Sequence, residues 1–185
     1  KKDIWNSIPD ALASAANQLK AKGWTSGQPW GYEIRLPQGG TCLYEGQPNT
    51  RPARDWVASG ITRIDGKRIP DKLLDAPAFI LTPGGTYGPM FLVFENFMVL
   101  KRYNFADLYA VFVGHLADRM SGQGNFAMPW TTPKIISTKE IEEIQERLKA
   151  RGLPIEKIDG KAGMNTRNLI GQYQQTSGIR VDCWP

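Results

Sequence analysis

Apolar residues recur along the chain at two different periods, which predict helices and short strands. Residues 7–22 carry apolar side chains at helical spacing, with Ser7 as N-cap and Gly23 as the stop. The longest helical pattern covers residues 104–121, and we expect Asn104 to cap its start. Its apolar side chains form one broad stripe expected to face the core: Phe105, Leu108, Tyr109, Phe112, Val113, Leu116 and Met120.

Shorter patterns add a minor β component. Residues 31–36 alternate apolar with charged side chains, and the apolar run 90–94 is typical of a buried strand. A short helix is expected at 55–59, while Gly, Pro and isolated aromatic residues dominate much of residues 24–79. The predicted fold class is therefore mainly α with minor β.

A change in composition predicts a domain boundary. Residues 123–136 contain glycine and proline and are interpreted as a linker. A second helical unit follows, beginning with Ser137 and Glu140 in a capping box and containing a further helix at 166–176. The predicted organisation is a first domain at 1–122, a linker at 123–136 and a second domain at 137–185.

Composition and charge narrow the class of protein. The 185 residues are 41% hydrophobic and 22% charged, which favours a folded core over disorder. The net charge of +5 favours polyanionic partners, and nucleic acid, anionic lipid and cell wall all qualify. A nucleic-acid binder is disfavoured because no basic cluster is interleaved with exposed aromatic residues. No run approaches the ~18–20 apolar residues that span a bilayer, and membrane attachment stays open.

The ionisable residues offer no clear catalytic or metal-binding group. Each acidic candidate is interpreted as a surface charge rather than a catalytic acid. Glu33, Glu45 and Glu95 lack polar framing, and the others lie at helix ends or on solvated faces: Asp107, Asp118, Glu140, Glu142 and Glu143. The single histidine, His115, has no partners at metal-ligand or catalytic-triad spacing. Two cysteines, Cys42 and Cys183, could pair in an oxidising compartment, but the sequence favours two separate thiols.

One constellation suggests a saccharide site. Tyr103 and Asn104 precede the long predicted helix, and Tyr109 lies within it. Tyrosine rings can cover the apolar face of a sugar, and an asparagine amide both donates and accepts hydrogen bonds. On the residues alone, a helix cap for Asn104 and core packing for Tyr109 are the favoured interpretations.

Many short motifs, in order, resemble the lytic murein transglycosylase B family over about residues 3–122. They include DIWNS at 3–7, GQPWGYE at 27–33, GPMFLV at 88–93, RYN at 102–104 and DLYA at 107–110. Residues 138–185 resemble the peptidoglycan-binding type 1 domain, a small three-helix module. The motifs there include the Asp159-Gly160 turn, Thr166-Arg167 and Tyr173-Gln174.

This resemblance implies a lysozyme-like domain and an activity on peptidoglycan in the periplasm. The family cleaves the β-1,4 bond between N-acetylmuramic acid and N-acetylglucosamine and leaves a 1,6-anhydro ring, without a metal or organic cofactor. Tyr103, Asn104 and Tyr109 fall on family positions that line the saccharide groove, so glycan strands are the expected partner.

The family's catalytic glutamate stands in a Glu-Ser pair upstream of everything matched here, and this sequence contains no Glu-Ser dipeptide. We therefore expect the chain to be the C-terminal part of such a domain, to pack against a missing N-terminal half that carries the glutamate, and to be inactive alone. The alternative is a non-catalytic wall-binding or scaffold protein.

Overall fold

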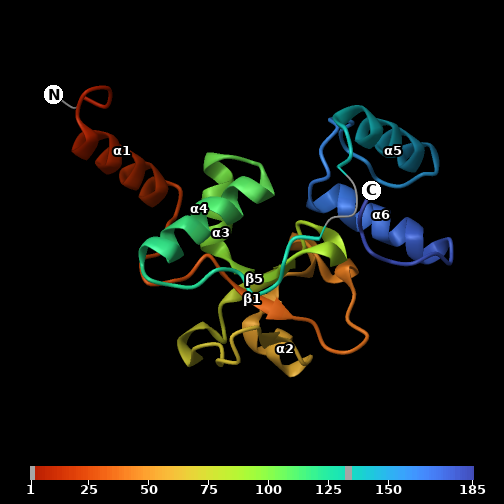
Figure 1. Ribbon diagram of the computed structural model, residues 1–185, viewed down its shortest axis with the longest axis horizontal. Coiled ribbons are helices and arrows are strands. Elements are labelled where there is room, and N and C mark those ends of the chain that lie inside the picture. Colours follow the sequence, from red (N-terminus) through yellow and green to blue (C-terminus); the bar gives the residue numbers. More distant parts are fainter. Residues whose placement is uncertain (1–2, 132–134) are drawn as a thin grey trace.

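A computed structural model describes residues 3–131 and 135–185, and it consists of helices around a small antiparallel sheet (Figure 1). The prediction of a mainly α protein with minor β is confirmed. The helices are α1 (Ile8–Ala21), α2 (Ala53–Ala58), α3 (Glu95–Tyr103), α4 (Asp107–Met120), α5 (Thr138–Ala150) and α6 (Met164–Thr176). The strands are β1 (Gly31–Arg35), β2 (Arg51–Pro52), β3 (Thr62–Arg63), β4 (Pro77–Leu81) and β5 (Met90–Phe94).

The sheet has the strand order β2-β4-β5-β1-β3, and every neighbouring pair is antiparallel. Successive side chains of the central strands point to opposite faces. Ile80 and Leu92 join a core that includes Trp56 of α2, whereas Phe79 and Phe91 join one that includes residues of α3 and α4. Because both faces of β4 are covered, its residues do not alternate between apolar and polar, and this strand was not predicted from the sequence.

Helix α4 contradicts the predicted orientation of its apolar stripe. Asp107, Ala110, Val111 and Gly114 are the buried residues of this helix, while most of the stripe expected in the core is exposed. The physical reason is close packing: a Cβ atom on Gly114 would lie 2.7 Å from the ring of Trp30. The helix therefore approaches Trp30 through its small residues, and its larger apolar side chains point outward.

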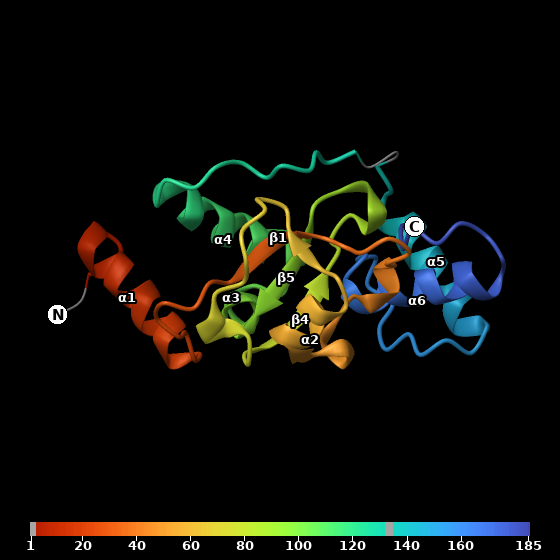
Figure 2. The same ribbon diagram turned by 90° about the horizontal axis from the view of Figure 1, so that it is seen from below.

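The C-terminal unit has its own small core at the opposite end of the molecule from α1 (Figure 2). The capping box of Ser137 and Glu140 is confirmed at the start of α5. Within the described residues, this unit contains the helices α5 and α6, whereas the resembled module has three.

A disulfide bond joins Cys42 to Cys183, so the expectation of two separate thiols is wrong. The two residues are 141 positions apart in sequence, and only the tertiary fold brings them together. The bond attaches the end of the C-terminal unit to the turn that follows β1.

The predicted linker lies along the first unit and contacts it. The amides of Ala127 and Met128 each donate to the Glu33 carboxylate at 2.8 Å, and the Thr131 amide donates to the carbonyl of Tyr87 at 2.7 Å. Residues 132–134 of the predicted linker lie outside the described residues. Among the described residues, none of the helices has the length and apolar character to cross a membrane.

Candidate functional site

Tyr103 and Asn104 form the corner between α3 and α4. Tyr103 is the last residue of α3, and half of its surface is exposed. Asn104 was expected to cap α4, but it is the C-cap of α3, and Ala106 occupies the N-cap position of α4. The Asn104 side-chain oxygen accepts from the Ala106 amide at 3.1 Å. This hydrogen bond stabilises the turn. Asn104 is exposed, and its side-chain NH₂ donates to no acceptor among the described residues.

Tyr109 lies on the outward side of α4, and 36% of its surface is exposed. Core packing was the rival interpretation for this residue, but the core side of α4 is made of smaller residues. All three predicted saccharide-site residues are therefore accessible to a ligand. Accessibility is necessary for sugar binding, and their joint contact with one glycan stays a prediction.

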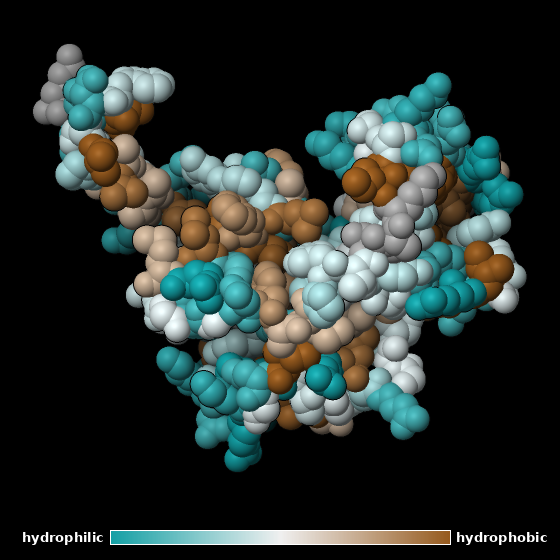
Figure 3. Space-filling model, in the orientation of Figure 1, coloured by the Kyte–Doolittle hydropathy of each residue, from teal (hydrophilic) through white to brown (hydrophobic). Residues whose placement is uncertain are grey.

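A continuous set of large apolar side chains surrounds Tyr109. We call the outward side of α4 the apolar face, defined by Phe105, Leu108, Tyr109, Phe112, Leu116 and Met120. Phe112 is 63% exposed, and Met120 is 82% exposed. Brown, hydrophobic surface is visible over α4 and also along α1 (Figure 3). In α1 the side chains of Ile8 and Leu12 are exposed. Soluble proteins rarely leave such a patch uncovered unless it binds something.

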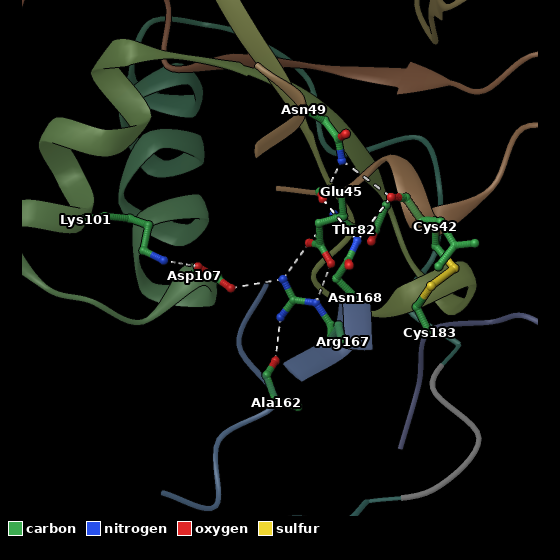
Figure 4. Close-up of polar contacts among 11 residues, drawn as sticks. Cys42, Glu45, Asn49, Thr82, Lys101, Asp107, Ala162, Arg167, Asn168 and Cys183 are labelled. Carbon is green, nitrogen blue, oxygen red and sulfur yellow. Dashed lines mark hydrogen bonds and ion pairs between the residues drawn. A yellow bond between two sulfur atoms is a disulfide. The ribbon is translucent and has the colours of Figure 1, made fainter. Parts of the chain in front are cut away.

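The contact between the two units has the opposite character, because charged groups are buried there (Figure 4). Arg167 of α6 donates through Nε and Nη2 to the two Glu45 oxygens at 3.0 and 2.6 Å, and through Nη2 to Asp107 at 3.0 Å. The Thr82 amide donates to Glu45 at 2.8 Å. Burial disfavours a charged Arg167, but the two carboxylates outweigh that effect and hold its pKa above the ordinary value.

Glu45 and Asp107 were interpreted as surface charges, and the structure corrects both. The side chain of Glu45 is 0% exposed, and that of Asp107 is 5% exposed and is also paired with Lys101. A buried carboxyl is a common signature of a catalytic acid. Here both Glu45 oxygens are occupied by Arg167 and no solvent reaches them, so this carboxylate is structural. No local sequence pattern indicates this ion pair, because Arg167 lies 122 positions away from Glu45.

Among the other acidic candidates, three lie on α5 of the C-terminal unit: Glu140, which takes part in the capping box, Glu142 and Glu143. The remaining three have partners in the first unit or the linker. The Glu33 carboxylate accepts from the two linker amides, and Glu95 pairs with Arg102 on the surface. Asp118 accepts from Trp30 Nε1 at 2.7 Å. Burial raises the pKa of Asp118, while the Trp30 hydrogen bond and His115 oppose that shift. This bond holds the Trp30 ring beneath α4.

His115 stacks against Phe126, with ring centroids 3.8 Å apart. Within residues 3–131 and 135–185, there is no group of three or more histidine, cysteine or acidic side chains that could hold a metal ion.

Comparison with known proteins gives a consistent match. A family model described as the transglycosylase SLT domain matches residues 1–118. The fold is similar to SltB3 from Pseudomonas aeruginosa in complex with NAG-NAM-pentapeptide, with a TM-score of 0.89 and 40% identity over 100% of this chain and 50% of that chain. The complex of SltB3 with NAG-anhNAM-pentapeptide gives a TM-score of 0.88 with the same identity and coverage.

This chain therefore spans about half the length of the SltB3 structures. No match is found among curated proteins. The transglycosylase part of the resemblance seen in the sequence is confirmed at the level of the SLT domain, and the peptidoglycan-binding type 1 assignment of residues 138–185 stays a prediction.

Proposed function

This chain belongs to the transglycosylase SLT domain family, and from that premise we propose that it forms part of a peptidoglycan lytic transglycosylase. The proposed reaction cleaves the β-1,4 bond between N-acetylmuramic acid and N-acetylglucosamine. A catalytic carboxyl donates its proton to the glucosaminyl oxygen, which leaves as the bond to the anomeric carbon breaks. The resulting carboxylate takes the proton of the muramyl 6-hydroxyl as that oxygen bonds to the anomeric carbon, so a 1,6-anhydro ring forms and no water is consumed. The observation that carries this proposal is the similarity to SltB3 complexes with NAG-NAM-pentapeptide and NAG-anhNAM-pentapeptide.

Tyr103, Asn104 and Tyr109 are the proposed glycan contacts of this chain. The Asn104 oxygen is held by the Ala106 amide, so its NH₂ group is oriented and free to donate to a sugar or acetamido oxygen. The exposed rings of Tyr103 and Tyr109 can cover apolar sugar faces. A hydroxyl at the edge of each ring adds hydrogen-bonding capacity.

The general acid of the reaction is proposed to come from outside the described residues. Such an acid needs a carboxyl that reaches the leaving oxygen. Two observations support this proposal. Five of the acidic candidates are engaged by Arg167, by backbone amides, by Trp30 or by surface arginine, and the other three lie on α5 of the C-terminal unit. In addition, the apolar face of α4 fits a surface that further protein covers. We propose that the missing part of the catalytic domain packs on this face and carries the glutamate.

We further propose that residues 137–185 bind peptidoglycan and that the protein works in the bacterial envelope. The similarity to SltB3 extends over the whole chain, including this unit. A disulfide between Cys42 and Cys183 also fits an oxidising compartment outside the cytoplasm.

The test uses the natural protein as its gene encodes it, incubated with purified peptidoglycan. Mass spectrometry should find muropeptides lighter by one water than hydrolytic products, as an anhydro ring requires. The Asn104→Asp variant keeps the oxygen that binds Ala106 but removes the amide donor, so turnover should fall at least tenfold while stability is unchanged. Asn125→Asp, the same substitution at an exposed residue outside both the α3–α4 corner and residues 137–185, is the matched control.

Two results would contradict the proposal. Hydrated products alone would make the enzyme a hydrolase, and binding without any cleavage by the natural protein would favour the wall-binding scaffold instead. Normal turnover in Asn104→Asp would limit this residue to a structural role in the turn. Residues 1–185 alone are expected to bind peptidoglycan without cleaving it, and anhydro products from this chain would refute the proposed location of the acid.

A further inference from the structure

A cavity lies on the opposite side of the sheet from α4. It has a volume of about 490 Å³, and its lining includes Pro37, Tyr44, Asn49, Arg51, Trp56 and Ser59. We call it the Arg51 pocket. It is formed by α2, the edge strand β2 and the turns after β1. The proposed saccharide site is at the α3–α4 corner, and Figure 1 shows these two helices on the other side of the sheet from α2. Its volume is within the range typical of small-molecule sites and exceeds the volume of a single ion.

The guanidinium of Arg51 is the main polar feature of this pocket. Its central carbon lies 3.5 Å from the centroid of the Trp56 ring, a cation–π contact. Its Nη2 reaches Ser59 Oγ at 3.4 Å, and its Nε is buried without a hydrogen-bond partner. No carboxylate of the described residues lies within 4 Å of it, although buried donors in proteins are normally paired.

The platform that holds this guanidinium is rigid. Arg51 pairs with Ala78 across β2 and β4, which fixes its backbone. Trp56 is only 2% exposed, and its indole N–H donates to the Ala78 carbonyl at 2.9 Å. The backbone of Arg51 and the indole ring of Trp56 are therefore both held by Ala78 of β4.

The other lining side chains have already used their donors. The Ser59 hydroxyl donates to the Trp56 carbonyl at 2.7 Å, and the Asn49 amide donates to the Glu45 carbonyl at 3.2 Å. The donors that remain belong to Arg51 and to the hydroxyl of Tyr44, which has no hydrogen bond to the described residues. A planar cation with unpaired donors, beside aromatic and proline surfaces, matches a carboxylate attached to a small apolar group.

We propose that the Arg51 pocket binds the carboxylate end of a peptide stem of peptidoglycan. The assignment of the peptide to the cell wall rests on the proposed function, whereas the preference for a carboxylate rests on the pocket alone. The pocket would hold the peptide branch of the wall, while the α3–α4 corner contacts the glycan.

The experiment is a titration of the ¹⁵N-labelled chain, followed at the Trp56 indole N–H by NMR. The probe is N-acetyl-D-Ala-D-Ala as free acid, and its C-terminal amide is the matched control. The acid should produce saturable shifts at Trp56, and the amide should bind at least about tenfold more weakly because it lacks the charge that pairs with Arg51.

Two variants and a second enantiomer complete the design. Arg51→Met keeps the length of the side chain and should weaken binding of the acid by about tenfold or more. Arg54→Met, on the exposed side of α2 where Arg54 pairs with Asp75, should bind like the unmodified protein. The same spectra show whether each variant is folded. N-acetyl-L-Ala-L-Ala should bind more weakly than the D-form, since wall stems end in D-residues.

Equal binding of acid and amide, unchanged binding by a folded Arg51→Met variant, or absence of shifts at millimolar probe would overturn the carboxylate site. A preference for the L-peptide, or no preference, would overturn its assignment to wall stems. None of these readouts measures glycan cleavage. A failure of the proposed enzyme activity and a failure of this pocket are therefore distinguishable.

Discussion

The surface that α6 covers and the surface that α4 exposes have reversed polarity. Under α6, the charged groups of Glu45, Asp107 and Arg167 are buried against one another. On the apolar face, Phe112 and its neighbours are exposed to solvent. A buried charge is costly unless a group of opposite charge pairs with it. A large exposed apolar patch commonly marks a binding surface. The first contact is complete within this chain, whereas the apolar face is the surface that, under the proposed function, further protein covers.

Removing the disulfide should have the largest effect on the completed contact. Replacing both Cys42 and Cys183 by serine releases a crosslink across 141 positions, and chain entropy then predicts a loss of about 5 kcal/mol in the free energy of unfolding. Urea denaturation with and without reductant measures it. The reductant should destabilise the unmodified protein and leave the double variant unchanged. Equal stability of the oxidised and reduced protein would show that Arg167 and its neighbours alone maintain the contact.

Arg167→Met should reduce the free energy of unfolding by about 3–5 kcal/mol, because buried Glu45 loses its counterion and Asp107 is left paired with Lys101. Chemical denaturation at neutral pH is the measurement, with Lys149→Met on exposed surface of α5 as control. Combining Arg167→Met with Glu45→Gln and Asp107→Asn removes the uncompensated charge and should recover part of the loss. A triple variant less stable than Arg167→Met would contradict this electrostatic account.

The packed side of α4 offers a smaller test. Gly114→Ala should destabilise the protein by about 1–3 kcal/mol, because its Cβ would meet the Trp30 ring at 2.7 Å. Without a clash, alanine would stabilise the helix relative to glycine, so a loss of stability can be attributed to the contact with Trp30. Gly124→Ala, where nothing lies within 4 Å of the added atom, should be close to neutral. A stabilised Gly114→Ala variant would mean that α4 sits further from Trp30.

The exposed side of α4 should give the smallest effect on this chain. Phe112→Ser should change the free energy of unfolding by less than about 0.5 kcal/mol, since the ring is 63% exposed. Binding of a hydrophobic dye should fall at the same time. In the natural protein the same substitution should be clearly destabilising if further chain covers the apolar face. A large loss of stability in residues 1–185 alone would show that the face is already packed.

Local patterns in the sequence determined the elements whose signals are contained within a few residues. The helix that begins after Ser7, the strand at 90–94 and the capping box of Ser137 and Glu140 were predicted correctly. The strand predicted at 31–36 is found at Gly31–Arg35. Motif order also identified the transglycosylase family, which the SLT domain match supports. Each of these signals depends on neighbouring positions, so it survives without knowledge of the fold.

The tertiary structure decided what each element faces. The apolar stripe of α4 predicts an amphipathic helix, but only the approach of Trp30 to Gly114 shows that the small residues are buried. In the same way, nothing in the sequence indicates the ion pair between Arg167 and Glu45 or the disulfide bond between Cys42 and Cys183, because the partners are more than 100 positions apart. Periodicity tells which residues share a side of a helix. Which side is buried depends on the shape and charge of the surface that the fold brings against it.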